Sequence, residues 1–155
     1  MVAVLSRMIA TLGGLGQSPI APGTLASLAA AAVWSVLPLS RTAQWVACTV
    51  FGVVGLWAAG HQVKAFRHTD PSQVVIDEWT GMWLALAGLP KTASVVIAGL
   101  FLFRFFDIGK FPPMKQLEHL HGGWGIMLDD VAAGLISRVV LGVLVWLFPR
   151  LAGVG

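Results

Sequence analysis

Charged side chains are scarce in this chain. Of its 155 residues, 11% are Asp, Glu, Lys or Arg and 57% are hydrophobic, and the mean hydropathy is +0.82. Soluble domains average about 25% charged residues, so the composition argues against a soluble globular protein and for one that resides in a membrane. The length suits one domain, which we expect to be a single membrane-embedded unit over residues 1–155.

Cysteine is nearly absent as well, since Cys48 is the only one. A lone cysteine excludes an intramolecular disulfide and a cysteine-based metal cluster. Basic runs are also missing, because the ten Lys and Arg are scattered along a chain whose net charge is +3. Nucleic-acid binding calls for a basic patch or stripe, whereas a small basic excess is ordinary in a membrane protein. We therefore expect no nucleic-acid partner.

Apolar segments, by contrast, are abundant and long. A hydrocarbon core about 30 Å thick needs roughly 20 apolar residues to cross it. Five segments reach or approach this length, at residues 20–38, 42–60, 74–90, 92–106 and 131–148. Ahead of them, Leu5, Met8, Ile9 and Leu12 recur at helical spacing, which is typical of an amphipathic helix on a membrane surface. We predict an all-α integral membrane bundle with about four to five transmembrane helices and a short N-terminal amphipathic helix.

The distribution of charge indicates an orientation. With five spans and a cytoplasmic N-terminus, six basic residues face the cytoplasm and three face outside, as the positive-inside rule favours. The same arrangement gathers every acidic residue at the cytoplasmic end, although acids contribute little to orientation. These seven acids are Asp70, Asp77, Glu78, Asp107, Glu118, Asp129 and Asp130.

The acids nearest the helix boundaries predict a metal site at the membrane surface. Carboxylates are costly within a membrane helix, and a cluster of them suits Mg²⁺, Ca²⁺ or Mn²⁺ better than zinc. Favourable placement at a helix N-terminus is the plainer explanation; it suits one acid but not three groups on one side. Because adjacent helical residues point about 100° apart, we expect only one of the neighbours Asp77 and Glu78 to bind the metal. The five candidate ligands are Asp77, Glu78, Asp107, Asp129 and Asp130.

Four motifs occur in order along the chain. They are SPxxPGT from Ser18, DExxG from Asp77, FRxFDxxK from Phe103 and GGxGIMxDD from Gly122. Taken singly, the first motif fits a plain turn better than a ligand-binding loop, and the third fits a surface salt bridge as well as a functional site. Taken together, they resemble the phosphatidylglycerophosphatase A family.

The resemblance implies a magnesium-dependent lipid phosphatase of the bacterial cytoplasmic (inner) membrane, with its active site facing the cytoplasm. Such an enzyme hydrolyses phosphatidylglycerol phosphate to phosphatidylglycerol and phosphate. The five acids would hold Mg²⁺ and act in catalysis, with either a water or an aspartate as nucleophile. Arg and Lys suit phosphate oxygens, and a histidine could protonate the leaving group. The expected substrate-binding residues are Ser18, Gly23, Thr24, Arg104, Lys110, His121, Gly122 and Gly123.

Rival interpretations remain open at this point. The enzyme could act on another lipid phosphate, such as phosphatidate, because headgroup choice depends on loop shape. A divalent-cation carrier would also gather acids near a membrane, although its acids should lie along a pore. A non-catalytic membrane subunit would account for the bundle but not for the four motifs. The sequence says nothing about oligomeric state.

Overall fold

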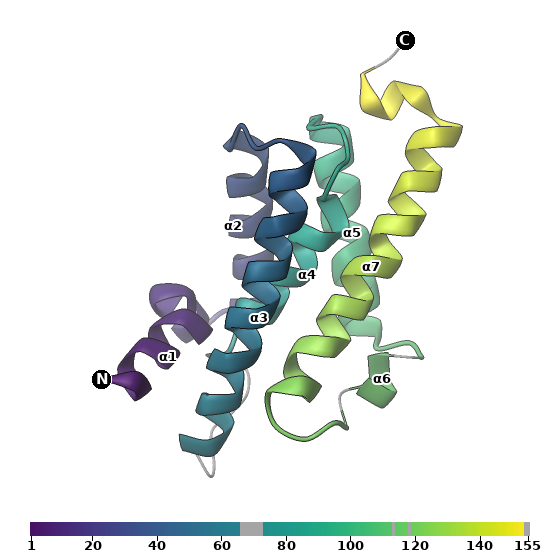
Figure 1. Cartoon of the computed structure of the whole chain (residues 1–155). Coiled ribbons are helices and arrows are strands. Elements are labelled where there is room, and N and C mark those ends of the chain that lie inside the picture. The colour runs from purple at the N-terminus through teal and green to yellow at the C-terminus, as the bar shows by residue number, and fades with distance from the viewer. Residues whose placement is uncertain (66–72, 113, 118, 154–155) are drawn as a thin grey trace.

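The computed structural model describes residues 1–65, 73–112, 114–117 and 119–153. Within these ranges all regular structure is helical (Figure 1). Two of the expected acids, Asp70 and Glu118, lie outside the described residues. The elements are α1 (Val2–Ala10), η1 (Leu12–Gln17), α2 (Pro22–Val36), α3 (Arg41–Ala65), α4 (Ile76–Leu86), α5 (Ala93–Gly109), α6 (Met114–Leu117), α7 (Gly123–Leu147) and η3 (Pro149–Ala152).

Helix α4 is the centre of the bundle. It contacts α2, α3, α5 and α7, and eight of its 11 residues are buried. The Trp83 indole N–H donates to the Ala30 carbonyl oxygen on α2 at 3.1 Å, and Trp83 and Met82 belong to the main apolar core. The longer helices α2, α3, α5 and α7 surround α4 and run up and down beside it (Figure 1).

Only two described helices are long and apolar enough to cross a membrane, Arg41–Val63 within α3 and Gly123–Leu147. Helix α2 has 15 residues and α4 has 11, which correspond to about 22 and 16 Å. The expected four to five spans are therefore not confirmed, whereas the all-helical bundle is. The apolar run of 74–90 suggested a span because hydropathy alone cannot separate a short helix buried in protein from one buried in lipid.

Helix α1 turns several of its apolar side chains away from the bundle. It packs on α3 through Ser6 and Ala10, both fully buried, and Gln62 Nε2 donates to Ser6 Oγ at 2.9 Å. Leu5 and Met8 are 52% and 57% exposed. The predicted N-terminal helix is present, but its predicted apolar face is divided. Leu5 and Met8 face outward, as a helix on a membrane surface needs, whereas Ile9 and Leu12 pack against a second apolar cluster and Leu12 lies beyond the end of α1. Its location at a membrane stays a prediction.

The crossing of α4 and α7 is unusually close because both helices carry glycine there. A Cβ added at Gly134 would lie 2.4 Å from the Gly81 carbonyl oxygen, and one added at Gly81 would lie 2.7 Å from the backbone carbonyl oxygen of Asp130. Small residues of this kind let helix backbones touch in membrane bundles. The contact brings the first turn of α4 directly beside Asp130 on α7.

Helix α7 begins at Gly123, eight residues before the boundary predicted at residue 131. The sequence stretch HGGWG suggested a loop, because glycine is unfavourable inside helices. The structure uses Gly123 for packing instead, since an added Cβ would lie 2.6 Å from the Gly60 backbone nitrogen of α3. As a result Asp129 and Asp130 lie in the second turn of α7 rather than at its start.

Candidate metal and phosphate site

Three carboxylates converge where α4 meets α7. Asp77 and Glu78 lie in the first turn of α4, and together with Asp130 each offers one oxygen atom within 4.8 Å of the others. Both members of the adjacent pair therefore face the same point, although the 100° step between neighbouring helical residues favours only one; which of them binds a metal stays a prediction. The glutamate side chain is longer by one methylene group, which lets its carboxylate reach back toward that of Asp77.

The carboxylate cluster Asp77–Glu78–Asp130 is poorly solvated. Asp77 is 9% exposed and Asp130 is 4% exposed. One oxygen of each carboxylate is buried without a hydrogen-bond partner: Asp77 Oδ1, Glu78 Oε2 and Asp130 Oδ2. Burial of an unpaired charge is expensive, and three negative charges so close together repel one another. Hard oxygen donors with this arrangement fit a small divalent cation such as Mg²⁺.

Arg104 closes one side of the cluster. Its Nη1 atom lies 2.5 Å from Asp107 Oδ2 and 4.0 Å from Glu78 Oε1, and it donates to Ser27 Oγ at 3.5 Å. The i, i+3 spacing of Arg104 and Asp107 predicts their contact, and the structure has it. Asp107 is consequently held in an ion pair at the edge of the cluster.

Lys110 and Asp129 form the other side. Lys110 Nζ lies 3.8 Å from Asp129 Oδ2, and Asp129 Oδ1 accepts from the backbone N–H of Asp130 at 3.1 Å. Lys110 follows the end of α5 in a left-handed conformation with φ of 43°, which turns the chain sharply there. Asp129 therefore lies beside the carboxylate cluster, and not among its three converging oxygens.

Gly23 is the residue of the SPxxPGT motif that reaches the cluster. A Cβ at this position would lie 2.0 Å from Glu78 Oε1, so α2 approaches Glu78 with bare backbone. Ser18 instead exchanges hydrogen bonds with the Ile20 backbone, and Thr24 is partly buried in the first turn of α2. Neither hydroxyl caps this helix, because its N-cap is Ala21 with no side-chain hydrogen bond.

A cavity of about 370 Å³ adjoins the cluster. Its polar side chains are those of Asp77, Lys110 and Asp129. Its other walls are apolar or glycine: Val63, Leu120, Gly122, Gly125 and Ile126. A cation, carboxylates and an apolar wall in one hollow suit a phosphate ester on an apolar carrier.

Two predicted substrate-binding residues, His121 and Gly123, have other surroundings than the carboxylate cluster, and Ser27 contacts the site although it was not predicted. His121 is exposed next to the cavity residue Gly122, and Gly123 is taken up by its contact with Gly60. Ser27 is fully buried and contacts Arg104, yet it was not assigned to the site. Its position one helical turn after Gly23, on the same face of α2, is the signal that would have found it.

The fold and these contacts together define a helical bundle that has two membrane-capable helices and an acidic centre at one end. The family model "Phosphatidylglycerophosphatase A" matches residues 8–145. The chain therefore belongs to the phosphatidylglycerophosphatase A family, as the four motifs predict.

Relatives with assigned names agree on a lipid phosphatase and differ in headgroup. The chain is 38% identical to a "Putative phosphatidylinositol-3-phosphatase" of Bacteroides thetaiotaomicron, over 92% of this chain and 94% of the relative. It is 35% identical to phosphatidylglycerophosphatase A of Escherichia coli, over 87% and 80%. The Haemophilus influenzae protein of the same name is 30% identical, over 87% and 85%. No solved structure matches the chain significantly.

Proposed function

We propose that this protein is a magnesium-dependent lipid phosphatase that hydrolyses phosphatidylglycerol phosphate at the cytoplasmic face of the bacterial inner membrane. The observation that carries the proposal is the convergence of Asp77, Glu78 and Asp130 beside a cavity that also contains Lys110. Family membership and the names of two relatives support the headgroup. The two membrane-capable helices support a lipid substrate.

Asp77, Glu78 and Asp130 would hold the metal, because their unpartnered oxygens are the donors that Mg²⁺ prefers. When bound, Mg²⁺ would neutralise phosphate charge and help to orient the nucleophile. Asp107 and Asp129 were predicted as further metal ligands, and we propose instead that they position Arg104 and Lys110. Their ion pairs with Arg104 and Lys110 place them around the three-carboxylate cluster.

Lys110 and Arg104 would bind the substrate phosphate in different ways. Lys110 lines the cavity, so its ammonium group would bind a phosphate oxygen as a point charge. Arg104 holds Glu78 and Asp107, and its fork geometry suits a bidentate contact with the phosphate. The Gly122 backbone, with φ of 70°, borders the same cavity without a side chain in the way.

We propose a water as the attacking group, with Asp129 as the base that activates it. This residue lines the cavity without belonging to the cluster of three converging oxygens. A water attacking phosphorus would give its proton to Asp129, and the phosphorus–oxygen bond to the lipid would break. His121, exposed beside Gly122, could return a proton to the leaving alkoxide.

A second candidate substrate deserves a direct test. The relative with 38% identity is named for phosphatidylinositol 3-phosphate, which favours a phosphorylated inositol lipid as the alternative headgroup. Phosphatidate is the simplest lipid phosphomonoester and serves as the third substrate in the comparison.

The test is phosphate release by the purified protein in mixed micelles that contain one of these three lipids at equal mole fraction. We expect the highest kcat/KM for phosphatidylglycerol phosphate. Preference for phosphatidylinositol 3-phosphate would reassign the headgroup while keeping the reaction. Release from none of the lipids by folded protein would contradict the proposed activity.

A further inference from the structure

The end of the bundle away from the carboxylate cluster is basic. The described acids lie in the first turn of α4, the last turns of α5 and the second turn of α7, which share one end (Figure 1). Toward the other end the described chain has cations and no acid. These cations are Arg41, Lys91, Arg138 and Arg150.

Arg138 and Arg41 have no carboxylate partner among the described residues. Arg138 Nε donates to the Ala87 carbonyl oxygen at 2.6 Å, and Arg41 lines the same hollow as Trp45, one helical turn away on α3. A Cβ placed on Gly88 would be 3.7 Å from Arg138 Nη2 and 3.5 Å from the Trp45 indole nitrogen. Two positive charges and an indole donor therefore gather at one place, which favours an anion between them.

An apolar groove leads away from this basic place. A hollow of about 430 Å³ follows α3 from Arg41 past Trp45 to Thr49. A second hollow of about 260 Å³ starts at Thr49 and lies between α3 and α7, with walls that include Gly52, Leu56, Met127 and Val131. Its exposed lining is almost wholly apolar.

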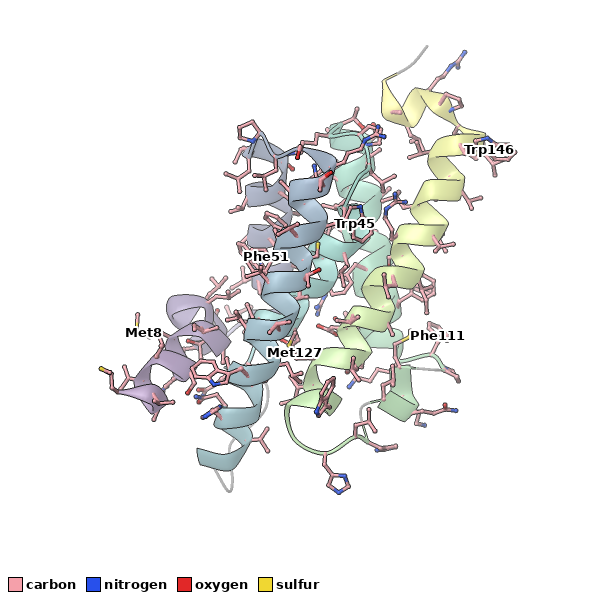
Figure 2. The ribbon with its side chains drawn as sticks, in the orientation of Figure 1. Met8, Trp45, Phe51, Phe111, Met127 and Trp146 are labelled. Carbon is pink, nitrogen blue, oxygen red and sulfur yellow. The ribbon has the colours of Figure 1, made fainter. Side chains whose placement is uncertain are left out.

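The two hollows and Arg138 are aligned along the helices. Helices α3 and α7 lie side by side and antiparallel (Figure 1). Figure 2 shows Trp45 farther toward the basic end than Met127. Val131 and Arg138 are two turns apart on one face of α7, about 10 Å along its axis. The groove is thus apolar over one stretch and cationic at its end.

We propose that this groove binds an anionic phospholipid that is not the substrate. Its phosphate would lie against Arg41, Arg138 and the Trp45 indole, and one acyl chain would lie between α3 and α7. Charge complementarity carries the headgroup part, because arginine within an apolar helix is costly without a counter-charge. The apolar stretch of the groove beyond the arginines supports a ligand with an acyl chain, because a water-soluble anion would have no apolar group to place there.

The test uses the full chain, purified in detergent, stripped of lipid and titrated while bound lipid is counted by native mass spectrometry. The lipids are phosphatidylglycerol and phosphatidylcholine with identical acyl chains. Arg41→Ala removes an exposed headgroup contact. Gly52→Leu fills the acyl groove, where an added Cβ meets only Thr80, at 4.0 Å. Gly52→Ala and Lys115→Ala are matched controls, and Lys110→Ala weakens any lipid held at the carboxylate cluster.

We expect one phosphatidylglycerol to bind more tightly than phosphatidylcholine. Arg41→Ala should weaken phosphatidylglycerol binding about fivefold with little change for phosphatidylcholine, and Gly52→Leu should weaken both. The controls and Lys110→Ala should keep the bound lipid. Three results would overturn the proposal: unchanged binding in both groove variants, displacement of the lipid by glycerol 3-phosphate alone, or a dimer in place of the lipid complex.

Discussion

Asp130 lies in a position that is unfavourable for a carboxylate unless a cation is present. It is 4% exposed, one of its oxygens has no partner, and Asp77 and Glu78 face it. The unfavourable burial and the repulsion are consistent with selection for binding rather than for stability. This leads to a prediction in which activity and stability move in opposite directions.

Asp130→Asn and Asp77→Asn should each lower phosphate release at least about 100-fold, since loss of even an outer partner of a metal ligand costs 10–100-fold. Without Mg²⁺, the same variants should unfold at an equal or higher temperature than the parent, because a buried charge and its repulsion are gone. Phosphate release and thermal unfolding measured on the same preparations check both halves. Retained activity would remove these carboxylates from the site.

Gly23→Ala tests whether α2 shapes the cluster. The added Cβ would lie 2.0 Å from Glu78 Oε1, so the flexible Glu78 carboxylate should move away and activity should fall about tenfold or more. Thermal stability should change little, because a side-chain end moves more easily than a backbone. Gly52→Ala, whose Cβ meets only Thr80 at 4.0 Å, is the control. Equal activity of the two variants would contradict this role for Gly23.

The sequence predicted which carboxylates lie in the site better than it predicted which of them contact one another. Asp77, Glu78 and Asp130 were named, but the sequence could not separate them from Asp107 and Asp129, which are held in ion pairs. That separation depends on side-chain length and on which helix lies opposite. The proposed roles of all five stay predictions until variants are assayed.

Among the elements, the contact of α4 with α7 sets the geometry of the site. Gly81 and Gly134 place the two backbones against each other, and this contact holds Asp77 and Glu78 beside Asp130. The contact should therefore matter for stability and activity together, unlike the contact of Gly23.

Gly134→Ala should destabilise the bundle by about 1–3 kcal/mol, the usual cost of inserting an atom into a packed core. The new Cβ would lie 2.4 Å from the Gly81 carbonyl oxygen, and backbone cannot move aside as a side chain can. Phosphate release should fall in the same variant because the cluster is pulled apart. Unfolding and activity are compared with Gly52→Ala, and wild-type stability in Gly134→Ala would refute the close crossing.

Helix boundaries were predictable where the sequence has clear stop signals and not elsewhere. Helix α2 ends at Val36, just before Pro38, and α7 ends at Leu147, just before Pro149, as proline predicts. The start of α7 and the short length of α4 were missed. At the start of α7, glycine serves close packing against α3, and in α4 the apolar run packs against neighbouring helices. A single sequence does not indicate which helix packs against such a segment.

Across the described residues, the acids gather at one end of the molecule, whereas basic residues occur at both ends. The described acids share one end with the C-terminus of α3 and the N-terminus of α7, while Arg41 and Arg150 lie toward the other end (Figure 1). The sequence predicted this gathering of the acids at one end from the order of its apolar segments and loops. The number of membrane crossings was less predictable, because it depends on which apolar faces meet lipid.

Cysteine labelling in intact cells checks the proposed orientation. A cysteine at the exposed Lys115 position should be protected from an impermeant thiol reagent, and one at the exposed Arg150 position should be labelled. Cys48 is buried and serves as the unlabelled background in the parent protein. The reverse pattern would place the acidic end outside the cell.

The most direct measurement is phosphate release from phosphatidylglycerol phosphate by the purified protein, with Mg²⁺ and with EDTA, for the parent and Asp130→Asn. We predict release by the parent that needs Mg²⁺, stops with EDTA and returns when Mg²⁺ is restored. Asp130→Asn should stay near background under every condition. Release that continues in EDTA, or in folded Asp130→Asn, would contradict the proposal that these three carboxylates hold a catalytic metal.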